Sequence, residues 1–328
     1  INSNLNQSIS RRTFMAVTLK DVAEACGVSY STVSKALKNS QLVKPKTKQM
    51  IQQKALEMNY IPNHSARALV SKRSGTIGLI WPSVDRVAVT HLISEINRAI
   101  KSLGYVMFVS IDDVAAASKK FVEFGCDGIV IFDEGDNSNL PPEIYNNVPV
   151  VAYGVDRDIP YPIINVNHAE AMIMAINALL EQGIQTIDYI GDINTNDARQ
   201  IAKKDAITNY CNAQNITYRI IDSNGLNAIE AEASVKQHLK TDTLSPGVIC
   251  GSYDITVGTI NAIGPENQPM IYSYDNIPQI KKLDYPVNAI GVPTSEIAQQ
   301  IVTTLDKVIK NEPTDAAYHL HPSLQNNI

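Results

Sequence analysis

A short stretch near the N-terminus carries four hydrogen-bonding side chains, those of Tyr30, Ser31, Ser34 and Lys35. The apolar residues between and after them recur at helical spacing, which predicts a helix with these side chains on its exposed face. Polar side chains in the first turns of a helix can read base edges in the major groove of DNA. The alternative is an amphipathic helix that only packs against its neighbours.

A second helix is predicted just before this one. Thr18 is a suitable N-cap, apolar residues follow it at helical spacing as far as Cys26, and Asp21 complements the dipole of the first turn. Residues 27–29, Gly-Val-Ser, fit a tight turn, and Ser29 can cap the helix that follows. Together the two helices predict a helix-turn-helix.

Pro45 is predicted to open a third helix, and Pro62 to end it. Ile51, Ala55 and Met58 share one face of that helix at the spacing expected of a packed side. Three lysines crowd its start and can meet phosphates, which fix the register of a protein on DNA. These lysines are Lys44, Lys46 and Lys48.

The charge of the chain is unevenly distributed. The whole sequence has 28 Lys and Arg against 33 Asp and Glu, a net charge of −5. Residues 11–73 hold 12 basic and 3 acidic residues, a balance of +9, so the remainder has 16 basic and 30 acidic residues, a balance of −14. A basic head on an acidic body predicts a polyanionic partner at one end only.

Residues 63–69 could form a short helix with little apolar surface. A helix of about seven residues should not be stable alone, which indicates either a linker or a segment that folds against a partner. Leu69 is an apolar residue among basic ones and suits a wedge that enters a minor groove.

Three stretches are similar to the lac repressor family of bacterial transcription regulators: TLKDVAEACGVSYSTVSKAL, NYIPNHSARAL and GTIGLIWP. The resemblance implies that Tyr30, Ser31 and Lys35 touch bases, and that the Leu69 residues of two subunits insert together at the operator centre. Relatives commonly have arginine at the position of Lys35, and lysine lacks arginine's planar fork of donors, so base preference there should differ. The predicted DNA-contacting set is Thr18, Tyr30, Ser31, Thr32, Ser34, Lys35, Lys38, Asn63, His64, Arg67 and Leu69.

From Gly75 onward, short apolar runs alternate with helical patterns, which predicts an α/β fold with parallel sheets. The resemblance implies a periplasmic-binding-protein-like body of two lobes with a ligand cleft between them. The expected divisions are a disordered extension (1–16), a helix-turn-helix DNA-binding domain (17–62), a hinge helix and linker (63–74), and an effector-binding and dimerisation domain (75–328). Its N-lobe is expected at about 75–165 and 290–313, and its C-lobe at about 166–289 and 314–328.

Loops after the predicted strands are the expected ligand site, because open parallel sheets bind ligands beyond the carboxyl ends of their strands. The resemblance implies that Arg199 grips ligand oxygens, for which its fork of donors is suited. It also implies that Asp254 accepts sugar hydroxyls, although a simple helix cap is the alternative. Relatives carry aromatic residues where this chain has Arg-Val-Ala-Val at 86–89 and again where it has Lys203. The predicted effector-binding set is Asp85, Arg86, Arg199, Tyr253, Asp254 and Asp275.

The sequence gives little support for an enzyme. The sequence has no GxSxG, P-loop, HExxH or Rossmann glycine motif, so we predict neither an activity nor a cofactor. The 4 cysteines are widely spaced, which favours reduced thiols over a metal site. The polar N-terminus and the lack of an apolar run of about 18 residues predict a cytoplasmic protein.

These observations predict a cytoplasmic, homodimeric repressor of a carbohydrate-utilisation operon. It is expected to bind a near-palindromic double-stranded DNA operator and to be released by a small-molecule effector, a sugar or sugar derivative, that shifts the lobes. One alternative is a corepressor- or partner-protein-dependent regulator of the same fold. Another is a solute-binding protein for capture or transport, against which the basic helical head argues.

Overall fold

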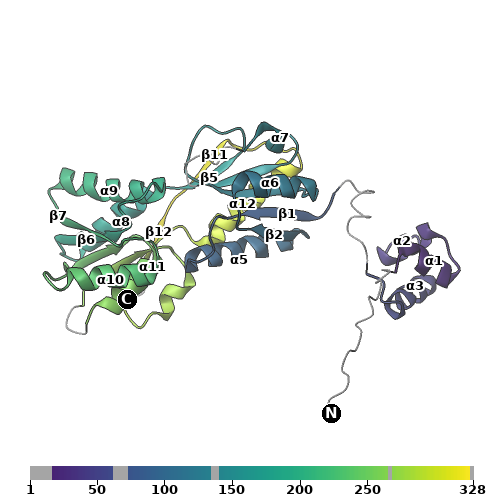
Figure 1. Ribbon diagram of the computed structural model, residues 1–328, viewed down its shortest axis with the longest axis horizontal. Helices are drawn as coiled ribbons and strands as arrows, with labels where there is room; N and C mark the ends of the chain where they lie inside the picture. Colours follow the sequence, from purple (N-terminus) through teal and green to yellow (C-terminus); the bar gives the residue numbers. More distant parts are fainter. Residues whose placement is uncertain (1–16, 62–72, 134–139, 265–267, 326–328) are drawn as a thin grey trace, which may run out of the picture. The chain divides into compact units, whose positions relative to one another are not determined.

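A computed structural model describes residues 17–61, 73–133, 140–264 and 268–325 (Figure 1). Its internal contacts divide the chain into two compact units, residues 1–72 and 73–328. All the described elements of the first unit are helices, and all the described strands lie in the second. In the parts of the chain that are described, no helix is long and apolar enough to cross a membrane.

The first unit contains the helix-turn-helix predicted from the sequence. Its helices are α1 (Leu19–Cys26), α2 (Tyr30–Leu37) and α3 (Pro45–Glu57). They enclose a small apolar core in which Val33 and Ile51 are fully buried. Helix α3 ends earlier than predicted, because the backbone of Asn59 turns left-handed with φ 51°. Pro62, the predicted end, lies outside the described residues.

The predicted caps of α1 and α2 are confirmed. The Thr18 side chain accepts a hydrogen bond from the Asp21 N–H, and the Asp21 carboxylate accepts one from the Thr18 N–H at 2.7 Å, which forms a capping box. Gly27 ends α1 with φ 65°, a conformation that glycine adopts without a Cβ clash. The Ser29 side chain accepts a hydrogen bond from the N–H of Thr32 and so begins α2.

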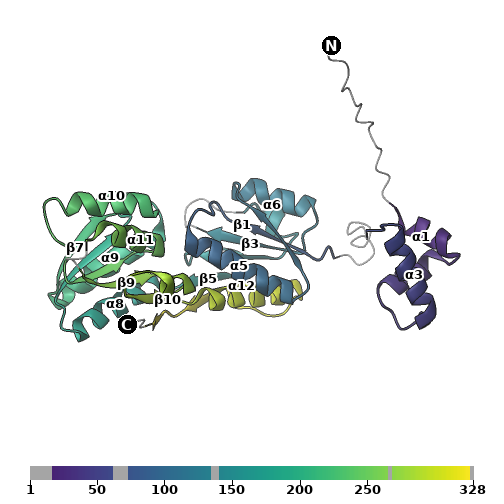
Figure 2. The same cartoon turned by 90° about the horizontal axis from the view of Figure 1, so that it is seen from below.

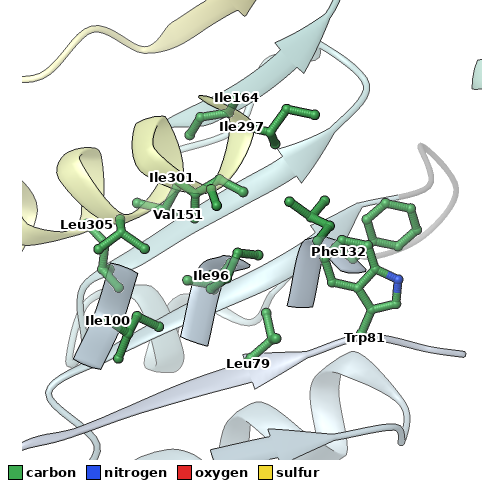
Figure 3. Packing of buried hydrophobic residues seen from close by; sticks show 14 of the residues in the cluster. Leu79, Trp81, Ile96, Ile100, Phe132, Val151, Ile164, Ile297, Ile301 and Leu305 are labelled. Carbon is green, nitrogen blue, oxygen red and sulfur yellow. The ribbon is translucent and has the colours of Figure 1, made fainter. Parts of the chain in front are cut away.

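The second unit has two sheets, each with helices on both faces (Figures 1 and 2). We call the first the N-lobe, whose parallel strands run in the order β11-β5-β4-β3-β1-β2. The strands are β1 (Thr76–Ile80), β2 (Val106–Ser110), β3 (Gly128–Asp133), β4 (Val150–Gly154), β5 (Ile163–Val166) and β11 (Ala317–Leu320). Helices α5 (Val87–Ser102) and α12 (Thr294–Ile309) cover one face, and α6 (Val114–Glu123) and α7 (Pro142–Tyr145) cover the other. Figure 3 shows side chains of α5 and α12, such as Ile96 and Ile301, meeting over the sheet.

The second sheet forms the C-lobe, with the order β12-β10-β9-β8-β6-β7 and only β12 antiparallel to its neighbour. Its strands are β6 (Thr186–Gly191), β7 (Thr217–Asp222), β8 (Gly247–Cys250), β9 (Met270–Tyr274), β10 (Val287–Gly291) and β12 (Ser323–Gln325). Helices α8 (His168–Glu181) and α9 (Ala198–Gln214) cover one face. Helices α10 (Ala228–His238) and α11 (Tyr253–Ala262) cover the other, and a 3₁₀ turn η1 (Pro278–Lys282) precedes β10.

The two-lobed α/β class is confirmed, but the predicted ends of the lobes are partly wrong. Residues 314–328 were expected in the C-lobe, whereas β11 pairs in parallel with β5 and so belongs to the N-lobe. Only β12 joins the C-lobe. Strand β10, which the sequence pattern did not predict, places residues 290 and 291 in the C-lobe as well. The described chain therefore passes between the lobes after β5, after β10 and after β11.

Candidate DNA-binding surface and effector cleft

Helix α2 presents the polar face that its sequence predicted. Its buried residues are Val33 and Ala36, so the opposite side faces solvent. Tyr30 is 52% exposed, unusually so for an aromatic side chain, and Ser31 and Lys35 are exposed beside it. Of the other predicted contacts in this unit, Thr18 and Lys38 are exposed and Thr32 and Ser34 are half-buried.

The lysines at the start of α3 are not equivalent. Lys44 and Lys46 are exposed and remain suited to phosphates. The Lys48 ammonium donates instead to the backbone carbonyl and the side-chain oxygen of Asn39, at 3.1 and 2.9 Å, and so closes the loop after α2. The predicted contacts Asn63, His64, Arg67 and Leu69 lie outside the described residues.

A cleft between the lobes of the second unit has an aromatic wall. Trp81 follows β1, Phe132 lies near the end of β3, and Tyr153 near the end of β4. The rings of Trp81 and Phe132 stack, with their centroids 4.3 Å apart. Figure 3 shows the two side chains side by side. The centroid of the Tyr153 ring lies 6.0 Å from that of Trp81 and 5.9 Å from that of Phe132. The predictions missed this wall, although each residue comes at the carboxyl end of a predicted strand.

Arg199, a predicted effector residue, lies in the cleft wall. It occupies the first turn of α9, and its Nε and Nη2 donate to the two carboxylate oxygens of Asp197 at 2.8 and 2.6 Å. Its guanidinium also lies 4.3 Å from the centre of the Phe132 ring, across the lobe boundary. Burial would raise the pKa of Asp197, but the Arg199 charge and hydrogen bonds outweigh it and lower that pKa.

Arg86 joins the two lobes at another side of the cleft. It is the N-cap of α5, and its guanidinium lies 4.0 Å from Asp254 and 3.6 Å from Asp275 of the C-lobe. The next residue, Val87, directs its N–H at Asp254 from 3.5 Å and packs with Ala88 against the C-lobe core. Burial raises the pKa of Asp254, while the Arg86 charge lowers it. The sequence predicted all three ionic residues of this group as effector contacts.

Lys203 is a buried cation that the predictions did not place in the site. Its ammonium donates to the Gly251 carbonyl at 2.9 Å and lies 3.7 Å from the centre of the Tyr274 ring. Burial lowers the pKa of Lys203 to about 7. On the far side of Tyr274, the phenol oxygen lies 2.5 Å from Nδ1 of His168. Burial likewise holds the pKa of His168 well below its usual value, so the imidazole is neutral.

Asp254 contacts Arg86 but does not itself line this cleft, and neither do two other predicted effector residues. Asp85 is exposed, bonds to Ser83 at 3.2 Å and borders an adjoining outer depression. The Tyr253 side chain packs against the C-lobe core, and only its backbone N–H takes part, by donating to Asp275 at 2.9 Å. Asp275 has φ 80°, a conformation that L residues rarely adopt, and this contact helps hold it there.

Among the described residues, no group of three or more His, Cys, Asp and Glu side chains is arranged to hold a metal ion. The cleft is lined instead by aromatic rings, two guanidinium groups, one ammonium, one carboxylate and several neutral polar side chains. Such a set can hold a small polar molecule by stacking and hydrogen bonding.

Comparisons with known proteins address both units. Residues 18–63 match the profile described as "Bacterial regulatory proteins, lacI family". The chain is 25% identical over 324 residues to the HTH-type transcriptional regulator RegA of Clostridium saccharobutylicum, with 92% of this chain and 95% of RegA covered. It is 26% identical over 323 residues to catabolite control protein A of Staphylococcus xylosus, with 92% and 95% covered. The solved structure of the lac repressor dimer bound to operator and the anti-inducer ONPF has a TM-score of 0.80 at 23% identity, over 94% of this chain and 97% of that one, and so shows the same fold.

Proposed function

Because the chain belongs to the lacI family of DNA-binding transcription regulators and is not an enzyme, we propose that it is a homodimeric repressor of a carbohydrate-utilisation operon. A sugar or sugar derivative in the cleft acts as its inducer. The observation that carries the proposal is the exposed polar face of α2 in a lacI-type head, on a chain whose body has a cleft for a small polar molecule.

The first test is selection of operator DNA by the full-length chain from random duplexes. We expect a near-palindromic site whose affinity falls steeply with salt, because lysine contacts to phosphates release counterions. Tyr30→Ala should remove the preference for that site, whereas Gln53→Ala, an exposed change on α3, should leave it intact. Ligand binding without any salt-sensitive DNA binding would support a solute-binding role and contradict the proposal.

The inducer site is the cleft formed by both lobes. The aromatic wall of Trp81, Phe132 and Tyr153 suits the apolar side of a sugar ring, and Arg199 places a guanidinium beside that wall. Trp81 is the single tryptophan of the chain, so its fluorescence should report ligand entry. A panel of sugars, sugar acids and sugar phosphates should contain a compound that changes this fluorescence and releases the operator. A compound that tightens operator binding would favour the corepressor alternative.

The homodimer is proposed from an exposed apolar edge of the N-lobe, made of Phe108 and Val109 of β2 together with Ile111 and Phe124. Strand β2 ends its sheet, so its outer backbone groups are also open to a partner. An exposed apolar cluster of this kind marks an interaction surface. A second copy of this chain is the occupant that a near-palindromic operator requires, because two heads must bind two half-sites.

Residues 63–74 complete the proposal as a hinge that couples the body to the head. The sequence supports this role through Leu69, an apolar side chain among basic residues that suits insertion into a minor groove. Leu69→Ala should weaken operator binding far more than binding to random DNA. An equal loss of affinity for both kinds of DNA would contradict the insertion of Leu69 into the minor groove.

A further inference from the structure

The charged side chains of the cleft wall are mostly cations. Arg86, Arg199 and Lys203 line it, whereas Asp275 is the one carboxylate among its described lining residues. The oxygen of Asp275 that faces Arg86 already accepts from a backbone N–H. Asp197, which balances Arg199, does not line the cleft. The charged groups that a ligand meets in this cleft are therefore mainly cations. Gln200 adds a buried neutral acceptor, its Oε1, which has no hydrogen-bond partner among the described residues.

Two of these cations have donor capacity left within the described part of the chain. The buried Nε of Arg86 has no hydrogen-bond partner there, and its contacts with the carboxylates, at 3.6 and 4.0 Å, are longer than hydrogen bonds. The Lys203 ammonium has three N–H donors, of which one is used by the Gly251 carbonyl. Its other contact is with the Tyr274 ring. Buried donors of this kind favour an acceptor supplied by the ligand.

We propose that the effector carries an anionic oxygen group, a carboxylate or a phosphate ester, which binds at Lys203 and Arg86. This inference rests on the proposed function, since it names the class of inducer. The neutral part of the molecule packs against the aromatic wall, and the anionic group enters the deeper part of the cleft near Tyr274.

The protonation state of the Lys203 amine depends on the groups that face it. Burial lowers its pKa to about 7, Arg86 and Arg199 add to this effect, and Asp275 and Asp197 oppose it. The remaining neighbours, Tyr274 and His168, are uncharged near neutral pH, because burial raises the pKa of the phenol and lowers that of the imidazole. Asp254, whose pKa is raised, lies against Arg86.

Without ligand, the Lys203 amine is thus partly unprotonated at pH 7. A ligand anion within about 4 Å favours the ammonium form and raises its pKa. Binding then converts the amine and one proton into an ammonium ion, with no other bond made or broken. A neutral sugar supplies no charge to drive this step, so proton uptake distinguishes the two ligand classes.

The experiment uses the full-length protein and two matched series: glucose, glucuronate and glucose 6-phosphate, and the corresponding galactose compounds. Trp81 fluorescence and thermal stabilisation are measured at pH 6.5 and pH 8.5. We expect at least one acid or phosphate to bind, with an affinity that falls up to about tenfold per pH unit above pH 7. The relative response to the acid and the phosphate identifies the anion. Binding by neutral sugars alone, or no binding by any anionic member, would overturn the inference.

Calorimetry in two buffers of different ionisation enthalpy then counts protons directly. At pH 7 we expect a measurable uptake of less than one proton per bound anion, since the lowered pKa leaves part of Lys203 unprotonated there. Lys203→Met should abolish the uptake and weaken the anion more than the neutral sugar of its series. Lys240→Met, an exposed change in the same lobe, is the matched control and should alter neither quantity. Equal uptake in wild type and Lys203→Met would contradict the assignment.

Operator binding is measured on the same preparations, so failure of the inference and failure of the proposed function can be told apart. If the protein binds its operator and only neutral sugars release it, with no proton uptake, the anionic effector is contradicted and the repressor function stands. If the protein binds the anion with proton uptake but binds no operator, the anion site stands and the repressor function is contradicted.

Discussion

Arg86 of the N-lobe and Asp275 of the C-lobe lie across the cleft from each other, with Nη2 and Oδ2 3.6 Å apart. Arg86 also faces Asp254, and the N-terminus of α5 packs on the C-lobe core beside it. The pair therefore joins the lobes at the cleft. A ligand that binds either side chain changes the free energy of this lobe arrangement relative to others, which is what a small-molecule switch requires.

Arg86→Met should destabilise the second unit. The change leaves the buried Asp254 carboxylate without its nearest cation, a loss that costs about 3 kcal/mol at neutral pH. Urea unfolding followed by Trp81 fluorescence measures it. Arg98→Met is the control, because Arg98 pairs with Glu95 while 73% exposed and should change stability by less than about 1 kcal/mol. Similar losses of stability in the two variants would show that the ion pair across the cleft contributes no more than an exposed ion pair.

Arg199→Ala should uncouple the inducer from DNA. Its fork is the donor group nearest the aromatic wall, so its loss should weaken binding of whichever sugar or sugar derivative induces wild type by tenfold or more. Operator affinity without inducer should stay within about twofold, because the substitution lies in the other compact unit. Gel-shift titrations with and without inducer give both numbers. Normal release of the operator would place the inducer elsewhere.

Phe108→Glu should convert the dimer to a monomer. A charge in the middle of the exposed apolar edge cannot be desolvated without a partner, so the association constant should fall by at least a hundredfold. Sedimentation velocity measures it, and operator affinity should fall in parallel. Ile229→Glu is the control, since Ile229 is 81% exposed on α10 of the other lobe. A Phe108→Glu chain that remains a dimer would move the interface to another surface.

Local signals explain which parts of the fold were predictable. The caps of α1 and α2 depend on residues within three positions of Thr18 and Ser29, and both were predicted. Which lobe strand β11 joins depends instead on which sheet has an open edge for it. Strand β11 pairs with β5, some 150 positions earlier, and nothing near residue 317 encodes that choice.

The same distinction applies to the cleft. Arg199 and Asp275 were found because their loops resemble those of known relatives, and Arg86 because its loop follows a predicted strand. All three line the cleft. The aromatic wall was missed, because the strands that carry it, β1, β3 and β4, become neighbours only in the folded sheet. Lys203 was noted only as the replacement of an aromatic residue. Its place beneath Tyr274 follows from the packing of α9 against the C-lobe sheet.

Lys203→Met should make the ligand-free protein more stable at pH 7. The pKa of Lys203 is about 7 in the folded chain, below the 10.5 that is ordinary for a free lysine. A lowered folded-state pKa means that the unfolded chain binds more protons, so stability rises with pH between these two values and is lost as pH falls toward 7. The advantage of the methionine variant should therefore shrink by up to about 1.4 kcal/mol per pH unit from pH 7 to pH 9. Urea midpoints at four pH values measure it, and Lys240→Met should show no such trend. A methionine variant that is less stable at pH 7, by an amount that does not change with pH, would mean that the ammonium serves only to hold the Gly251 carbonyl.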